Sequence, residues 1–173
     1  MKKALIGLVA AIALVGAVDL DGRIGMGLGW APEATSIGGL FTIPVTDIAV
    51  TRFGLSPKLA VEPIVQFTLD SGDSLDYMLF KLSVLGNFLW KGHAKTNLYT
   101  KLGLGFSMDK YDDQDMEFAF HLPVGFGLEH FVSEHFSLNL AALSGFTFSS
   151  RGDQIGLKLG NDKPFAFYLL WYY

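Results

Sequence analysis

The fold of this chain is decided by the stretch PFAFYLLWYY, residues 164–173. Bulky residues recur at every second position along it, which is typical of a β-strand with one continuous apolar face. Two locations are compatible with such a strand. In the first, the strand is buried between two layers of a water-soluble domain. In the second, its bulky face contacts an apolar medium outside the protein. The residues of that face are Phe165, Phe167, Leu169, Trp171 and Tyr173.

The composition of the whole chain is apolar and poor in charge. Of 173 residues, 50% are hydrophobic and only 17% are charged, with 15 Phe, 20 Gly and no Cys. Such a surface is sparsely charged for a protein that faces water on all sides. No apolar run after the N-terminus reaches the roughly 18 residues that a spanning helix needs. The apolar excess therefore indicates strands. A net charge of −4 without a basic stripe argues against a nucleic-acid partner.

Residues 1–17 have the pattern of a secretory signal peptide. Two lysines open the segment, an apolar run follows, and small residues ending at Ala17 form the cleavage site. The competing prediction is a single spanning helix, but the run is short and is followed by Asp19 and Asp21. We therefore predict a mature domain of residues 18–173. The absence of cysteine excludes a lipid-modified N-terminus and disulfides.

Alternating apolar and polar residues recur after the leader in segments of about ten, separated by turn residues. We count eight such segments and predict a strand for each. The last strand, which carries the bulky face described above, is expected to pair with the first strand and so close a ring. The predicted strands are residues 20–30, 46–55, 59–69, 78–88, 97–108, 116–129, 136–148 and 165–173.

Arg52 and two prolines test this pattern. An arginine that faces lipid inside an apolar belt costs about 2–4 kcal/mol, so we expect Arg52 to point away from the face formed by Phe53 and Leu55, with a bulge nearby. Pro63 and Pro123 cannot donate a ladder hydrogen bond, and a closed barrel has no edge strand to accommodate them. Bulges are expected at both prolines.

The connections between predicted strands also alternate in character. Those after the second, fourth and sixth strands are compact, at residues 56–58, 91–96 and 132–135. Those after the first and seventh are longer, and those after the third and fifth are acidic. Short turns on one side and longer loops on the other are typical of an outer-membrane barrel.

Volume decides which face of the strands points inward. About five or six large side chains on each of eight strands cannot fit inside an eight-stranded barrel, whose interior is just wide enough for side chains to fill. The opposite face is rich in Gly, Ala and Ser and does fit. We therefore predict a barrel with its apolar face outward and its small and polar face inward.

The inward face carries charges that need partners, because an unpaired buried charge is costly. We predict a structural network of ion pairs and hydrogen bonds that plugs the lumen. The alternative is a gated conduit or a proton-sensing histidine, since such networks and functional sites perturb titratable groups alike. The residues of the predicted network are Arg23, Arg52, Glu62, Lys81, Lys101, Glu117, His121 and Glu129.

On these residues the chain resembles the small outer-membrane β-barrel family of Gram-negative bacteria, which includes outer membrane proteins A, X and W. The resemblance covers the whole chain, from the leader to the closing aromatic strand, and includes the strand-turn-strand segment 52–60. It implies a location in the bacterial outer membrane. It also implies that the bulky face of residues 165–173 is the signal read by the barrel-assembly machinery, with Tyr173 where that family usually has Phe.

No catalytic, cofactor or metal site is predicted. His93, His130 and His135 lie at or beside short turns, and only His121 lies within a strand. Lipid-modifying barrels resemble one another in placing a His with a Ser or Asp at the outer rim, which none of these positions offers. Metal-ligand spacing, phosphate loops and nucleophile elbows are missing from the sequence.

Two loop motifs have alternative interpretations. The tripeptide 151–153, Arg-Gly-Asp, matches an integrin-type motif, but three residues recur by chance. The acidic group Asp112, Asp113 and Asp115 could hold a divalent cation at the lipopolysaccharide surface, but it lacks the spacing of a dedicated calcium loop, so a solvated loop is preferred.

The sequence therefore predicts an all-β, eight-stranded antiparallel transmembrane up-and-down barrel with a structural or surface-interaction role. One alternative is a narrow pore or lateral conduit for small or hydrophobic solutes, and another is a lipid-modifying enzyme. The expected partners are outer-membrane lipids and lipopolysaccharide, with the assembly machinery during biogenesis. A monomer is expected.

Overall fold

The computed structural model describes residues 18–31, 47–72, 75–112, 114–151, 154–160 and 165–173. The predicted signal peptide, Asp113 and the last two residues of the Arg-Gly-Asp motif lie outside the described residues. The strands are β1 (Ile24–Trp30), β2 (Ile48–Ser56), β3 (Leu59–Gly72), β4 (Leu75–His93), β5 (Thr96–Tyr111), β6 (Glu117–Phe131), β7 (Phe136–Arg151), β8 (Gln154–Leu159) and β9 (Phe165–Tyr172).

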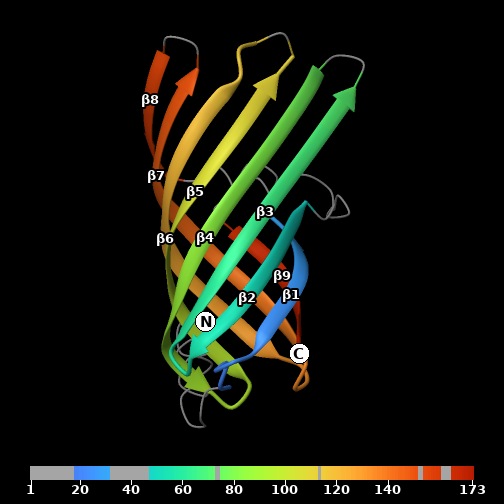
Figure 1. The fold of residues 1–173 in the computed structure, drawn as a ribbon, viewed down its shortest axis with the longest axis vertical. Helices are drawn as coiled ribbons and strands as arrows, with labels where there is room; N and C mark the ends of the chain where they lie inside the picture. Colours follow the sequence, from blue (N-terminus) through green and yellow to red (C-terminus); the bar gives the residue numbers. More distant parts are fainter. Residues whose placement is uncertain (1–17, 32–46, 73–74, 113, 152–153, 161–164) are drawn as a thin grey trace, which may run out of the picture.

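Eight of these strands form a closed antiparallel ring (Figure 1). Each strand from β1 to β7 pairs with the next along the chain, β7 also pairs with β9, and β9 pairs with β1. The eight-stranded antiparallel barrel is confirmed, and so is the predicted closing pair between the first and last strands. Among the described residues, no helix is long and apolar enough to cross a membrane.

The stagger of the ring follows from the register. Starting at Phe148 of β7 and stepping to the directly opposite residue on each neighbour, the path returns to β7 at Leu138, ten residues away. Such a stagger requires strongly tilted strands, about 35–45° from the barrel axis. The residues on the path are Phe148, Phe120, Phe106, Leu82, Val65, Ala49, Leu28, Leu169 and Leu138.

The strand β8 was not predicted and lies outside the ring. It pairs with β7 over residues 146–151, whereas β9 pairs with β7 over residues 136–142. One long strand therefore serves two partners in succession. The hairpins β3–β4, β5–β6 and β7–β8 project together beyond the shorter strands β1, β2 and β9 (Figure 1).

The bulges expected at Pro63 and Pro123 are wrong. Pro63 lies opposite Val84 and Pro123 opposite Gly145 in unbroken register. On the other side of each proline, pairing is interrupted for two residues and resumes without a shift. Because proline lacks an N–H, local pairing is lost without an extra residue. The bulge expected in the second strand lies at Leu55, and another lies at Trp90.

The first strand is shorter than predicted. It begins at Ile24, and Leu20, which the predicted strand 20–30 places in the same outward phase as Met26 and Leu28, is only 4% exposed. The reason is a turn in which the Arg23 N–H donates to the Leu20 carbonyl at 2.9 Å. Gly22 adopts a left-handed conformation there (φ 69°), which glycine tolerates without strain. The turn directs Leu20 into the end of the barrel.

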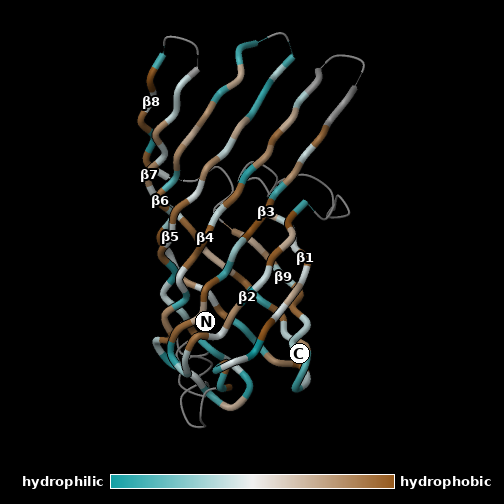
Figure 2. The backbone as a smooth tube through the Cα atoms, viewed as in Figure 1, coloured by the Kyte–Doolittle hydropathy of each residue, from teal (hydrophilic) through white to brown (hydrophobic). Residues whose placement is uncertain are grey.

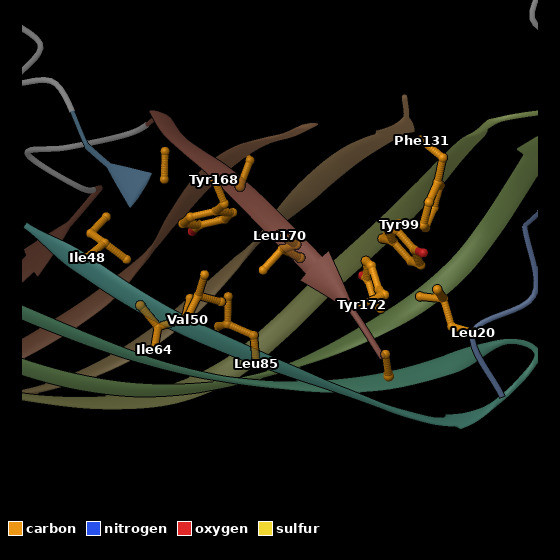
Figure 3. Packing of buried hydrophobic residues seen from close by; sticks show 13 residues of the cluster. Leu20, Ile48, Val50, Ile64, Leu85, Tyr99, Phe131, Tyr168, Leu170 and Tyr172 are labelled. Atoms are coloured by element: carbon orange, nitrogen blue, oxygen red, sulfur yellow. The ribbon is translucent and has the colours of Figure 1, made fainter. Parts of the chain in front are cut away.

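Large apolar side chains cover the outside of the ring, as predicted. Phe126 is 62% exposed, Leu104 57% and Met26 53%, and hydropathy alternates along the strands (Figure 2). The interior is less uniformly small than predicted, because Tyr168, Leu170 and Tyr172 of β9 lie inside the ring with apolar residues of other strands (Figure 3).

Three glycines of β1 make this packing possible. Gly25, Gly27 and Gly29 lie directly opposite Tyr172, Leu170 and Tyr168, respectively. A Cβ atom placed on Gly25 would lie 2.7 Å from the Tyr172 ring, and one on Gly29 would lie 2.6 Å from the Tyr168 ring. The glycine face of the first strand therefore provides the space that the large inward face of the last strand fills.

Candidate functional site

Four charged side chains meet inside the barrel near the end with the short turns. Arg52 of β2 binds Glu62 of β3 through Nε at 2.7 Å and also through Nη2, and its Nη1 lies 2.8 Å from Glu129 of β6. Lys101 of β5 donates to the second oxygen of Glu62 at 2.7 Å. All four side chains are at most 2% exposed. Two positive and two negative groups therefore form a neutral buried cluster, which we call the ion cluster.

Neutral side chains satisfy the remaining oxygens of the ion cluster. Glu129 accepts hydrogen bonds from Tyr172 (2.6 Å), Ser137 (2.7 Å) and Tyr99 (2.9 Å). Asn87 donates to Glu62 at 3.3 Å. Because each charge has an opposite charge and both carboxylates accept several hydrogen bonds, the desolvation cost of burial is largely offset.

An aromatic ring lies beside each of the two cations. The Arg52 guanidinium lies 5.4 Å from the centre of the Tyr99 ring, and Lys101 Nζ lies 5.9 Å from that of Tyr168. Cation–π contacts of this kind are strongest where water is excluded. With Tyr168 and Tyr172 both at most 2% exposed, the cluster and its aromatic neighbours leave little solvent-accessible space at this level of the lumen.

The structure brings four of the eight predicted network residues together, and the other four lie elsewhere. Arg23 is at the short-turn end, where its guanidinium lies 4.8 Å from the centre of the Tyr172 ring and donates to the Glu134 carbonyl. Glu117 is half-buried at the start of β6, opposite Arg151. Lys81 and His121 lie on the lumen side between these two levels.

His121, a member of the predicted network, lies between two hydroxyl groups. Its Nε2 lies 2.8 Å from Ser107 Oγ and its Nδ1 lies 2.9 Å from Thr147 Oγ1. A serine and a histidine at this distance are the minimum for nucleophilic catalysis, but a triad also needs a group that orients the imidazolium and an accessible nucleophile. Here the second partner is a neutral hydroxyl and Ser107 is 5% exposed. The contact is an internal hydrogen-bond chain facing the lumen, away from the lipid-exposed rim.

A small cavity of about 20 Å³ adjoins this histidine, enough space for about one water molecule. It lies where β7 changes partner between β9 and β8. Its lining combines lumen-facing residues with residues of the outer face of β7. The lining residues are Lys81, His121, Pro123, Ser144, Gly145, Phe146, Thr147 and Gly160.

Sequence reasoning missed the neutral residues that complete the ion cluster. Asn87, Tyr99, Ser137, Asn139 and Tyr172 all lie in the inward phase of their strands and are at most 7% exposed. The phase was available from the alternation, since Tyr99 is two residues from Lys101 and Tyr172 is in the opposite phase to Trp171. The prediction selected inward-facing residues by their charge alone and therefore left out the neutral residues that form hydrogen bonds.

The residues predicted as an assembly signal lie on the outer face of β9. Leu169 is 45% exposed, Trp171 50% and Tyr173 75%. Phe167 stacks on Trp30 of β1 with ring centroids 4.9 Å apart. Within the part of the chain that the structure describes, no group of three or more His, Asp or Glu side chains could hold a metal ion. Asp112 and Asp115 are both exposed.

Comparison with solved structures identifies the same architecture. The solution structure of outer membrane protein W of E. coli has a TM-score of 0.50, 10% sequence identity, and covers 88% of this chain and 97% of that one. The crystal structure of Ail, the attachment invasion locus protein of Yersinia pestis, has a TM-score of 0.47 with 15% identity and covers 88% of this chain and 99% of that one. The predicted resemblance is confirmed at the level of the fold. Neither the protein-family models nor the curated proteins include a match.

Proposed function

We propose that this chain is an integral protein of the bacterial outer membrane with a structural or surface-interaction role and a plugged lumen. The observation that carries the proposal is the inverted distribution of side chains. Phe67, Phe126 and Leu104 are 50–62% exposed, whereas Arg52 and Glu62 are fully buried. In water this arrangement would expose apolar area on all sides of the barrel, whereas in lipid it satisfies both faces.

The height of the apolar surface supports a membrane location. On β4 the outward apolar residues run from Met78 to Phe88, and ten residues of a strand tilted by about 40° rise about 25 Å, the height of the lipid-facing band of such barrels. At the short-turn end, Trp90 is 74% exposed and Tyr173 75%. Exposed aromatic residues at this boundary match the interfacial girdle. The likeness in fold to outer membrane protein W supports the same location.

The plugged lumen is supported by the energetics of the ion cluster. An open channel at this level would need water beside Arg52 and Glu129, and the packing leaves both side chains at 0% exposure. Removing one partner from a buried pair costs about 3–5 kcal/mol. Thermal opening of the plug by breaking all three ion pairs is therefore rare.

A surface role is supported by the projecting hairpins. β4 and β5 continue past the apolar band, where Tyr77 and Tyr111 stack with ring centroids 4.4 Å apart. Cross-strand aromatic pairs of this kind stabilise the pairing of neighbouring strands. We further propose that the partners are outer-membrane lipids and lipopolysaccharide along the wall, and the barrel-assembly machinery at β9 during biogenesis, with the barrel acting as a monomer.

The location is tested by fractionation and by gel mobility. The protein is expected to separate with outer membranes, and its mobility on a denaturing gel should change on boiling, because a closed barrel resists detergent until heated. A protein that is found in the periplasmic fraction and migrates identically with and without boiling would overturn the proposal.

The plug is tested by conductance in planar bilayers. The native barrel is expected to be silent. Steady channels in the native protein that disappear when Arg52 or Glu62 is neutralised would overturn the plugged lumen, because they would show that the ion cluster lines a conducting path.

A narrow lateral conduit is a second candidate, favoured by the cavity beside Gly145. There β7 residues 143–145 have neither β8 nor β9 opposite them among the described residues, and the cavity reaches both the lumen side and Phe146. In vesicles, S144W should abolish uptake of a small apolar dye if solutes pass there. Uptake that is equal with and without this substitution removes the candidate.

A further inference from the structure

The segment before β1 crosses the short-turn mouth of the barrel and folds into it. Leu20 is 4% exposed and belongs to the interior apolar cluster with Tyr99 and Tyr172. Gly22 donates its N–H to the Gly54 carbonyl at 3.1 Å. A Cβ atom on Gly54 would lie 2.6 Å from the Leu20 carbonyl carbon, so this glycine allows the main chain to pass. We call residues 18–23 the N-terminal strap.

One end of the strap is fixed by a buried amide. Asn97 is 0% exposed, accepts a hydrogen bond from the Val18 N–H at 3.1 Å, and donates to the Val18 carbonyl at 2.9 Å. A side-chain amide that pairs with both main-chain groups of one residue fixes its position as a strand partner would. Asn97 also donates to Tyr99 at 2.9 Å.

This contact continues into the ion cluster. The Tyr99 hydroxyl donates to Glu129 at 2.9 Å, and the same carboxylate oxygen lies 2.8 Å from Arg52. Three successive contacts therefore connect Asn97, at the strap, with the arginine at the centre of the plug.

The other end of the strap reaches the same carboxylate by a different route. Arg23 lies over the Tyr172 ring, with Cζ 4.8 Å from its centre, and over Phe131 at 5.6 Å. The Tyr172 hydroxyl donates to Glu129 at 2.6 Å. The two oxygens of Glu129 thus accept hydrogen bonds from two tyrosines. Tyr172 contacts Arg23 at one end of the strap, and Tyr99 contacts Asn97, which binds the other end.

We propose that the N-terminal strap is a second seal of the barrel and a positioning element for the plug. Seated, it closes the short-turn mouth with Leu20 and fixes Tyr99 and Tyr172, which orient Glu129 toward Arg52. Unseated, it releases both tyrosines, and the ion cluster loses the donors that hold its carboxylate. The strap acts on the plug through these residues.

Seating of the strap is tested by thiol accessibility, which is clean because the native chain has no cysteine. In the purified full-length barrel, L20C should react with a membrane-impermeant maleimide at least about tenfold more slowly than D21C, since a buried site reacts only during local opening. Asp21 is the matched control because it is the next residue and is exposed. Equal rates would overturn the proposal.

The role of Asn97 is tested in the same assay. Asn97→Ala should accelerate labelling of L20C about threefold or more, because it removes the anchor of Val18. Asn139→Ala is the control, since Asn139 is also buried and contacts Glu129 at 3.4 Å without touching the strap. Acceleration by Asn139→Ala alone would show that Asn97 does not anchor the strap. Boiling-dependent gel mobility verifies that each variant is folded.

Coupling to the plug is tested by single-channel recording. Leu20→Ala should produce brief openings in a barrel that is otherwise silent, whereas Asp21→Ala should remain silent. If Leu20→Ala shows the boiling-dependent gel mobility of a folded barrel but never opens, the strap does not position the plug. The two proposals can fail separately. A conducting native barrel would contradict the proposed plug, whereas the labelling rates test whether the strap is seated and do not depend on a closed lumen.

Discussion

At the scale of single residues, Glu129 is the carboxylate that connects the most strands inside the barrel among the residues of the ion cluster. It pairs with Arg52 and accepts hydrogen bonds from two tyrosines and a serine on different strands. Removing this carboxylate would leave all of these buried donors without their acceptor at the same time, and each unsatisfied donor is costly.

We expect Glu129→Ala to lower the free energy of unfolding by about 3–5 kcal/mol, because it leaves Arg52 with only Glu62 and leaves several donors unsatisfied. Urea unfolding of the barrel in detergent micelles measures the change. Glu134→Ala, which alters an exposed side chain in the nearby turn, should change stability by less than about 0.5 kcal/mol. Similar losses for both variants would contradict the importance of the ion cluster.

The glycines of β1 give a second prediction. Gly29→Val should hinder closure of the ring by about 1–3 kcal/mol of overpacking, because its Cβ would clash with the Phe167 carbonyl oxygen and would lie 2.6 Å from the Tyr168 ring. The fraction of protein with folded-barrel gel mobility reports the effect. Gly86→Ala is the control, since its nearest contact would be the exposed Phe88 ring at 3.2 Å. Normal folding of Gly29→Val would show that the β1–β9 contact is looser than described.

The sequence predicted residues well where one physical rule decided their direction. Arg52 was placed inward because lipid excludes charge, and it is fully buried. The sequence-based prediction failed where the same physical rule allows two different local structures. Pro63 was expected to form a bulge, and the strand instead lost pairing locally. Leu20 was placed outward by its phase, and the turn at Gly22 reversed it. Neither outcome is encoded in periodicity.

At the scale of elements, β9 carries large side chains on both of its faces. Its outward residues include Leu169 and Trp171, whereas Tyr168, Leu170 and Tyr172 fill the interior against the glycines of β1. Alternation predicted the outward face of this strand. It did not show that the inward face is equally large, because the space comes from a strand more than a hundred residues away in sequence.

Leu169→Arg should reduce stability by about 2–4 kcal/mol, the cost of a cation facing lipid near the middle of the membrane. Val132→Arg is a matched control, because Val132 is 51% exposed and Leu169 45%, but Val132 lies in a short turn. The recovery of folded barrel in outer membranes compares the two. Equal recovery would show that the face of β9 occupied by Leu169 does not contact lipid.

At the scale of the whole molecule, closure of the ring separates strands that are essential from one that is not. β9 completes the ring by pairing with both β1 and β7. β8 pairs only with β7 among the described residues, and its Ile155 is 90% exposed. The barrel and its plug therefore depend on β9, whereas β8 extends a projecting hairpin.

A pair of proline substitutions tests this division. Leu157→Pro should disturb the pairing of β8 with β7 and leave the boiling-dependent gel mobility of the barrel unchanged. Leu169→Pro should abolish it, because proline in the middle of a sheet removes a ladder hydrogen bond and β9 has a partner on each side. The two leucines are comparably placed on outward faces, at 68% and 45% exposure. If Leu157→Pro also prevents folding, closure requires β8, and the ring of eight strands is not the independent unit.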